Sequence, residues 1–112
     1  MFGNSTNHLA HMVEKHQWEK IEKKLSKAGT EEKAALAAAC GSSTDDEAIM
    51  LLVNLLQDDD DKVLLQAVKS LGEVGIDSSK MHLQWLLNHL PDDKKELRQA
   101  IDEATAKISK RS

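Results

Sequence analysis

The sequence predicts an all-α protein built from stacked helical hairpins. Residues 46–75 contain two helical stretches joined by a turn of four aspartates, Asp58–Asp61. Within each stretch the apolar residues recur at intervals of three and four, which is the period of a helix buried along one side. The same spacing recurs upstream and downstream, and a repeated helical hairpin is the sequence signature of an α-solenoid.

The first helix of the central hairpin is apolar on two sides. One stripe comprises Ile49, Leu52, Val53 and Leu56, and the other comprises Ala48, Leu51 and Leu55. A helix with two apolar sides needs neighbours on two sides. The second helix has one apolar face, made of Val63, Ala67, Leu71 and Val74, and glycines at positions 72 and 75 favour its end. Such a hairpin is not stable alone, so similar hairpins should stack on it.

Similar hairpins are present on both sides of the central one. At an offset of 34 residues downstream, Leu83, Leu86, Leu87 and Leu90 repeat the stripe that starts at Ile49. At an offset of 31 residues upstream, Trp18, Ile21 and Leu25 repeat it more weakly. We therefore predict six helices in three hairpins, at residues 14–41, 46–75 and 78–108, with degenerate copies at the ends.

Residues 46–75 resemble a short HEAT repeat, of the kind also found in phycobilisome-lyase-type proteins. The matching features are an acidic start, a Leu-Leu pair, the aspartate turn and the run VLLQAVKSLGEVG after it. Residues 80–108 match well and residues 14–41 match loosely. The chain departs from the family at Leu64, where the family usually has an arginine that contacts an aspartate of another repeat. The period also fits a tetratricopeptide repeat, but the Trp-Leu-Gly-Tyr set of that family is missing. The HEAT resemblance implies a right-handed α-solenoid whose second helices line a concave, partner-binding side.

The length of 112 residues suits a single domain. Residues 1–13 are predicted to form a flexible N-terminal arm, and residues 14–112 the HEAT-like repeat domain. The arm begins with polar residues, and Leu9, Met12 and Val13 fall on the opposite side of a helical wheel from the first hairpin's stripe. We interpret these three residues as a separate turn or a hydrophobic staple. The basic C-terminal tail, SKRS, is expected to fray.

Composition narrows the classes of function. A formal charge of −4 argues against a nucleic-acid backbone as the main partner. The single cysteine cannot form an internal disulfide and fits a reducing compartment. No apolar run approaches the roughly 20 residues of a membrane span, and the N-terminus lacks the basic-then-apolar order of a signal peptide. We expect a cytoplasmic protein without a membrane partner.

The residues that could carry chemistry each have a simpler structural explanation. Asp58–Asp61 lacks the glycine and distal glutamate of an EF-hand, and its carboxylates suit the start of the next helix. The histidines show no zinc-binding spacing with a cysteine. They are His8, His11, His16, His82 and His89. Cys40 takes the place of a core leucine and is expected to be buried. We therefore expect no metal site, no cofactor and no enzymatic activity.

The third hairpin has an unusual second stripe, His82, Trp85 and His89, at the positions of the apolar second stripe in the central hairpin. If this stripe faces the preceding hairpin, it can be polar in the first hairpin, where it contains Lys20 and Lys24, but must be apolar or amphipathic in the second and third. We therefore predict that Trp85 contacts the second hairpin and is shielded from water, with the two histidines at the edges of that contact.

The outer face of the second helices is the candidate binding surface. Its predicted protein-binding residues are Lys62, Leu65, Gln66, Lys69, Glu73, Gln99 and Glu103. Leu65 is a large apolar residue without an evident packing role, and an apolar anchor ringed by polar groups resembles the hot spot of an interface. The alternative interpretation is an ordinary solvated face.

The resulting hypothesis is a non-catalytic adaptor that binds a protein or peptide, as a monomer or weak homo-oligomer. Two alternatives remain open. One is a structural unit that self-associates, and the other is an accessory subunit of a chromophore-handling or other enzyme. The accessory alternative comes only from the family resemblance, because the sequence offers no chromophore-handling residues.

Overall fold

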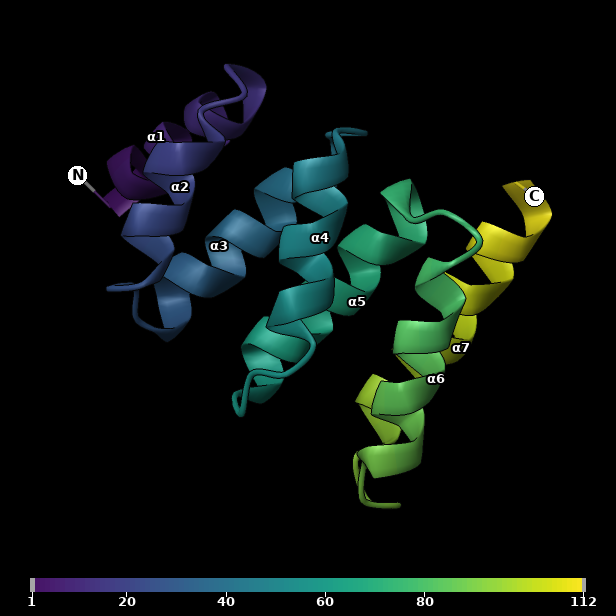
Figure 1. Cartoon of the computed structure of the whole chain (residues 1–112). Helices are drawn as coiled ribbons and strands as arrows, with labels where there is room; N and C mark the ends of the chain where they lie inside the picture. Colours follow the sequence, from purple (N-terminus) through teal and green to yellow (C-terminus); the bar gives the residue numbers. More distant parts are fainter. Residues whose placement is uncertain (1, 112) are drawn as a thin grey trace.

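The computed structural model describes residues 2–111, with side chains from residue 8 onward. Within this range the chain forms seven α-helices and no strand, so the predicted all-α class is confirmed. The helices are α1 (Phe2–Glu14), α2 (Trp18–Leu25), α3 (Thr30–Cys40), α4 (Asp46–Leu55), α5 (Asp61–Val74), α6 (Ser79–His89) and α7 (Lys95–Arg111) (Figure 1).

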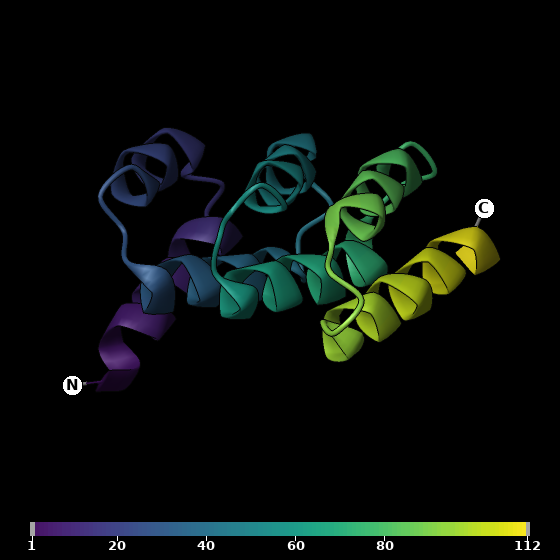
Figure 2. The same cartoon turned by 90° about the horizontal axis from the view of Figure 1, so that it is seen from below.

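The helices that follow α1 form two layers (Figure 2). One layer contains α2, α4 and α6, and the other contains α3, α5 and α7. In the second layer α5 packs closely against both α3 and α7, whereas α2, α4 and α6 make few direct contacts with one another. The layers are joined where α4 packs on α5 and α6 packs on α7. This is the predicted α-solenoid, with one continuous layer and one open layer.

The structure differs from the prediction at the N-terminus, where α1 replaces the flexible arm expected over residues 1–13. The described range therefore has seven helices instead of six, while residue 1 lies outside it. Leu9, Met12 and Val13 are buried, and α1 packs against α3 and α2. The chain turns at His16, whose φ is 58°, so α1 and α2 need not share one apolar stripe. Comparing them on a single helical wheel therefore hid the packing role of α1.

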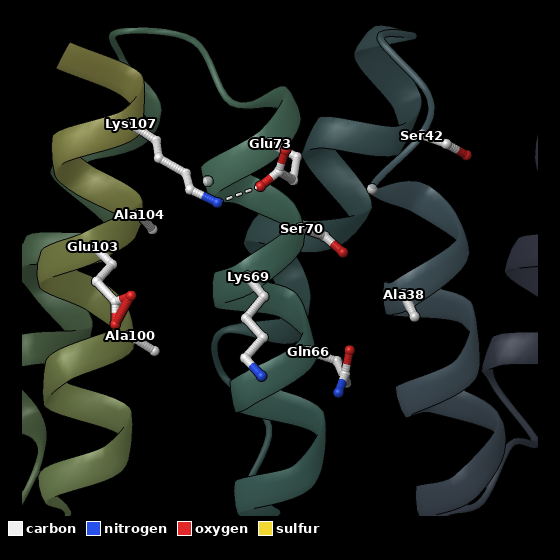
Figure 3. Close-up of a pocket in the computed structure, with 12 residues that line it drawn as sticks. Ala38, Ser42, Gln66, Lys69, Ser70, Glu73, Ala100, Glu103, Ala104 and Lys107 are labelled. Atoms are coloured by element: carbon white, nitrogen blue, oxygen red, sulfur yellow. Dashed lines mark hydrogen bonds and ion pairs between the residues drawn. The ribbon is translucent and has the colours of Figure 1, made fainter. Parts of the chain in front are cut away.

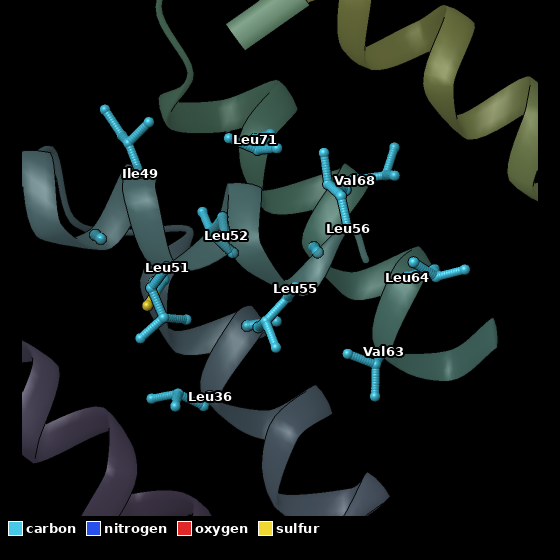
Figure 4. Close-up of a cluster of buried hydrophobic side chains, with 14 of the residues drawn as sticks. Leu36, Ile49, Leu51, Leu52, Leu55, Leu56, Val63, Leu64, Val68 and Leu71 are labelled. Carbon is cyan, nitrogen blue, oxygen red and sulfur yellow. The ribbon is translucent and has the colours of Figure 1, made fainter. Parts of the chain in front are cut away.

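The hydrophobic core runs through all three hairpins. Figure 4 shows its central part, where residues of both stripes of α4, such as Leu52 and Leu55, are buried. α4 has α5 on one side and α3 on the other, which explains why it needs two apolar stripes. On α5, Leu64, Val68 and Gly72 are spaced four residues apart and share one side of the helix. A Cβ atom at Gly72 would lie 3.2 Å from the Cβ of Ala104, so this side of α5 faces α7 at close range.

The positions on α7 that correspond to this stripe have a different character. They are Arg98, Asp102 and Ala106 at the same offset of 34 residues. Asp102 and Ala106 are exposed, and the Arg98 guanidinium donates hydrogen bonds to main-chain carbonyls at the end of α6. No helix in the described part of the chain covers this side of α7, and a polar outer face is typical of a terminal capping repeat.

Ion pairs link successive hairpins near the N-terminal ends of the second helices. Lys33 of α3 pairs with Asp58 at 3.0 Å, and Lys94 before α7 pairs with Asp61 at 2.6 Å. Asp60 is the N-cap of α5, and its carboxylate accepts a hydrogen bond from the main-chain amide of Lys62 at 2.8 Å. The aspartate turn therefore caps a helix, as its position in the repeat led us to expect. It also ties three hairpins together, which the sequence did not predict.

Residues 109–111 of the C-terminal tail do not fray in the way that its composition suggested, and Ser112 lies outside the described residues. Helix α7 continues to Arg111, whose guanidinium donates hydrogen bonds to the carbonyls of Gly72 at 2.7 Å and Gly75 at 2.8 Å. These carbonyls belong to the C-terminal end of α5, where main-chain acceptors lack partners within the helix. The last turn of α7 thus caps α5 of the preceding hairpin.

Candidate functional site

A groove crosses the outer face of α3, α5 and α7 (Figure 3). Its volume is about 480 Å³. The floor consists of small residues, which are Ala38, Gly41, Ser70, Gly72, Ala100 and Ala104, with Ser42 at one end. The rim consists of longer polar side chains, which are Gln66, Lys69, Glu73, Glu103 and Lys107. We call this feature the outer groove.

The floor of the outer groove lies where small residues let α3, α5 and α7 approach one another closely. A Cβ atom at Gly41 would lie only 2.7 Å from the hydroxyl oxygen of Ser70, so a larger residue here would displace that hydroxyl. The buried Ser70 hydroxyl donates a hydrogen bond of 2.7 Å to the carbonyl of Ala37 and so fastens α5 to α3. On the other side, Gly72 meets Ala104 of α7. The groove is therefore a consequence of tight helix packing.

The rim of the outer groove has balanced charge. Lys107 bonds to Glu73 at 2.5 Å and joins α7 to α5 at one end of the groove. The hydrogen bond and the positive charge from Lys107 hold the pKa of Glu73 below its usual value. Lys69 and Glu103 are exposed and extend from α5 and α7 on either side of the floor (Figure 3). Two cationic and two anionic side chains thus surround a floor without charge.

The structure brings some of the predicted binding residues together and separates others. Gln66, Lys69, Glu73 and Glu103 line the outer groove, whereas Lys62, Leu65 and Gln99 do not. Lys62 is paired with Glu31, and Gln99 is exposed on α7 away from the lining. Lys107 and the floor were missing from the predicted site. The small residues of the stretch AAACG at 37–41, and Ala100 and Ala104 one helical turn apart, were the signal that could have indicated a floor.

Leu65 does not have the role that the sequence suggested. It is half-buried and packs against the hydrophobic core, beside a shallow hollow that it shares with Leu97 and the residues before α7. The interpretation of Leu65 as an exposed anchor without a packing duty was therefore wrong. The helical wheel placed it on the outer side of α5, but the start of α7 comes close to that position.

The prediction that Trp85 is shielded from water was also wrong. Trp85 is 46% exposed and stacks on His89, with ring centroids 4.3 Å apart, while His82 is exposed as well. The reason is that α4 and α6 do not pack together. The contact between α5 and α7 sets the distance between the second and third hairpins, and an open cleft remains on the other layer.

The repeated helical hairpins match those of a known protein family. A sequence profile of HEAT repeats matches residues 19–106, which include most of α2 and of α7 and every helix between them. The chain belongs to the HEAT-repeat family. HEAT repeats generally mediate protein–protein interactions, and the family is typically non-catalytic. Comparisons with curated proteins and with solved structures find no match.

The groups available for chemistry in this HEAT-repeat protein are few. Cys40 is fully buried, and burial raises the pKa of its thiol to about 12, which keeps it protonated and a poor nucleophile at neutral pH. Among the described residues, no group of three or more His, Cys, Asp or Glu side chains is arranged to hold a metal ion. The part of the chain that the structure describes also has no helix with the length and apolar character to cross a membrane.

Proposed function

We propose that this HEAT-repeat protein is a non-catalytic adaptor that binds a protein segment in the outer groove. The observation that carries the proposal is the groove itself, which spans all three hairpins and has a floor of small residues. A floor of alanine, glycine and serine lets the main chain of a bound segment approach the helices closely. The rim then supplies donors and acceptors on both sides.

The charge and length of the outer groove indicate what kind of protein segment it can bind. Lys69, Lys107, Glu73 and Glu103 offer partners to polar side chains of either sign, so a mixed-charge or polar segment fits better than a strongly charged one. Three hairpins present a short surface, and short interfaces bind weakly unless a buried anchor contributes. We expect affinity roughly in the micromolar range.

The two ends of the stack support an adaptor over a unit that self-associates end to end. At one end α1 covers α3 with buried apolar side chains. At the other end α7 presents Asp102 and Ala106 where the central hairpin has the buried Val68 and Gly72. Stacking a further hairpin on Asp102 would bury a carboxylate without a partner, which is costly.

The proposal is tested by exchanging the charges of the rim. A partner captured with the full chain is titrated against Lys69→Glu combined with Glu103→Lys. Both residues are exposed and the net charge is unchanged, so helicity and melting temperature should stay the same while affinity falls about tenfold or more. The matched control is Glu19→Lys with Lys20→Glu on the exposed side of α2. Equal affinities of the folded rim variant and the control would place the binding site elsewhere.

A further inference from the structure

Exposed apolar surface is concentrated in the layer that the outer groove does not use. Among residues with described side chains, the large apolar ones that are exposed are Met50, Ile76, Met81 and Trp85. They lie on α4, on α6 and in the turn before α6. Met50 is 65% exposed and Ile76 is 54% exposed, so both present most of their surface to solvent. Folding does not account for apolar side chains at these positions.

An open cleft lies between α4 and α6, next to these residues. Its volume is about 470 Å³. Its lining comprises Asp46, Ile49, Met50, Val53, Asn54, Ile76, Ser78, Ser79 and His82. Ile49 and Val53 are one helical turn apart on α4, and Ile76 stands opposite them in the turn before α6. Trp85 follows His82 by three residues and therefore continues the same side of α6. We call this feature the α4–α6 cleft.

The clefts on either side of α4 are lined by carboxylates and by no lysine or arginine among the described residues. Asp46 lines the α4–α6 cleft, and Glu47 and Glu22 line a smaller cleft of about 310 Å³ between α2 and α4. This contrasts with the outer groove, whose rim has two lysines.

The carboxylates at the start of α4 also lack ion-pair partners. In residues 8–111 neither Asp46 nor Glu47 forms a salt bridge, whereas Asp58, Asp61 and Glu73 each pair with a lysine of another hairpin. The first turn of α4 therefore places two carboxylates without ion-pair partners beside an apolar cleft. A ligand that matches both properties must carry positive charge beside an apolar face.

We propose that the α4–α6 cleft binds a basic amphipathic helix of a partner protein. A helix is about 10–12 Å across, so it cannot enter a cleft of this size and instead lies along its mouth. From there it inserts one row of apolar side chains, spaced three and four residues apart, between Ile49, Val53 and Ile76. A lysine or arginine on its flank pairs with Asp46. Met50 adapts to the inserted side chains, because methionine is flexible and polarizable.

This second site is independent of the outer groove, since it lies in the other layer and shares no lining residue with it. The test uses the full chain and a fluorescein-labelled synthetic peptide of about 18 residues, which is long enough to form several helical turns. Its apolar face is leucine and its polar face is lysine. A second peptide has glutamate in place of every lysine. We expect the lysine peptide to bind at least about tenfold more tightly than the glutamate peptide, and to weaken as NaCl is raised.

Matched variants locate the site within the protein. Met50→Gln should weaken binding of the lysine peptide several-fold, whereas Met81→Gln, which changes a similarly exposed methionine outside the cleft, should not. Asp46→Asn should likewise weaken binding, and Asp102→Asn on α7 should not. In ¹⁵N-labelled protein the peptide should shift amide resonances of α4 and α6.

Several outcomes would overturn the inference. These are equal binding of both peptides, equal effects of Met50→Gln and Met81→Gln, or shifts confined to α3, α5 and α7. The last result would leave the adaptor proposal standing and remove only the second site. Sedimentation of the protein alone gives the remaining check. A dimer that Met50→Gln dissociates would mean that a second copy of this chain, and not a separate basic helix, covers the cleft.

Discussion

At the scale of single residues, Leu65 and Leu71 show how two leucines of one helix can differ in importance. Leu71 is fully buried in the hydrophobic core, whereas Leu65 is half-buried at the edge of that core. Truncating a fully buried leucine removes its transfer free energy and also leaves a cavity that neighbours cannot fill. At the edge of the core, neighbouring side chains and water can occupy much of the lost volume.

We expect Leu71→Ala to lower the free energy of unfolding by about 2–5 kcal/mol. Leu65→Ala should cost about 1 kcal/mol, because only part of its side chain leaves water on folding. Urea denaturation of both variants measures the difference. Equal losses of unfolding free energy in the two variants would contradict the deeper burial of Leu71.

At the scale of elements, α1 is held to the rest of the molecule in two ways. Its apolar stripe packs on α3, and the turn that follows it is fastened to the next hairpin. His16 Nδ1 is hydrogen-bonded to the carboxylate of Asp45, and Trp18 Nε1 donates to the same carboxylate at 3.0 Å. These bonds, from His16 first and then from Trp18, lower the pKa of Asp45. The first helix is therefore part of the folded unit.

Two neighbouring residues of α1 test its packing. Leu9→Asp places a carboxylate in a site that is 2% exposed, and it should cost more than about 2 kcal/mol or unfold the N-terminal hairpin. Ala10→Asp introduces the same group at an exposed position of α1 and should cost less than about 1 kcal/mol, through the lower helix propensity of aspartate. Thermal melting followed by circular dichroism compares the two. If α1 were a flexible arm, both variants would melt like the wild type.

At the scale of the whole molecule, ion pairs between hairpins make the stack sensitive to acid. Burial by itself raises the pKa of Asp58, but hydrogen bonds from the Asp60 amide and from Lys33 outweigh it and hold this pKa below its usual value. The pKa of Glu73 is lowered by Lys107. Groups with a lower pKa in the folded state favour folding when they are ionised.

The sign of the pH dependence follows from these shifts. The stabilisation is present above the ordinary values of 3.8 for Asp58 and 4.5 for Glu73, and it is lost as the pH falls through their lower folded-state values. We expect the urea midpoint to fall progressively on acidification below about pH 4.5. Lys33→Met should reduce the acid-dependent part of this loss, because Asp58 then loses its cationic partner. Lys20→Met on α2 serves as the control and should leave the pH profile unchanged.

The sequence by itself determined the helical hairpins, their order and their family. The two apolar stripes of α4 predicted a helix with neighbours on two sides. The recurrence of one stripe 34 residues downstream located the third hairpin. The sequence also identified the acidic turn correctly as a helix cap. It identified four residues of the groove rim as outward-facing, namely Gln66, Lys69, Glu73 and Glu103. All of these depend on the direction in which a side chain leaves its own helix, and local periodicity reports that direction.

Only the tertiary structure decided how far apart the helices lie. Gly41, Gly72 and Ala104 bring α3, α5 and α7 together, and that contact leaves α4 and α6 separated, with Trp85 in solvent. The same arrangement places α7 beside Leu65 and gives Leu9 a surface on α3 to cover. Periodicity cannot supply these distances, because they are set by the volumes of side chains that meet from different helices.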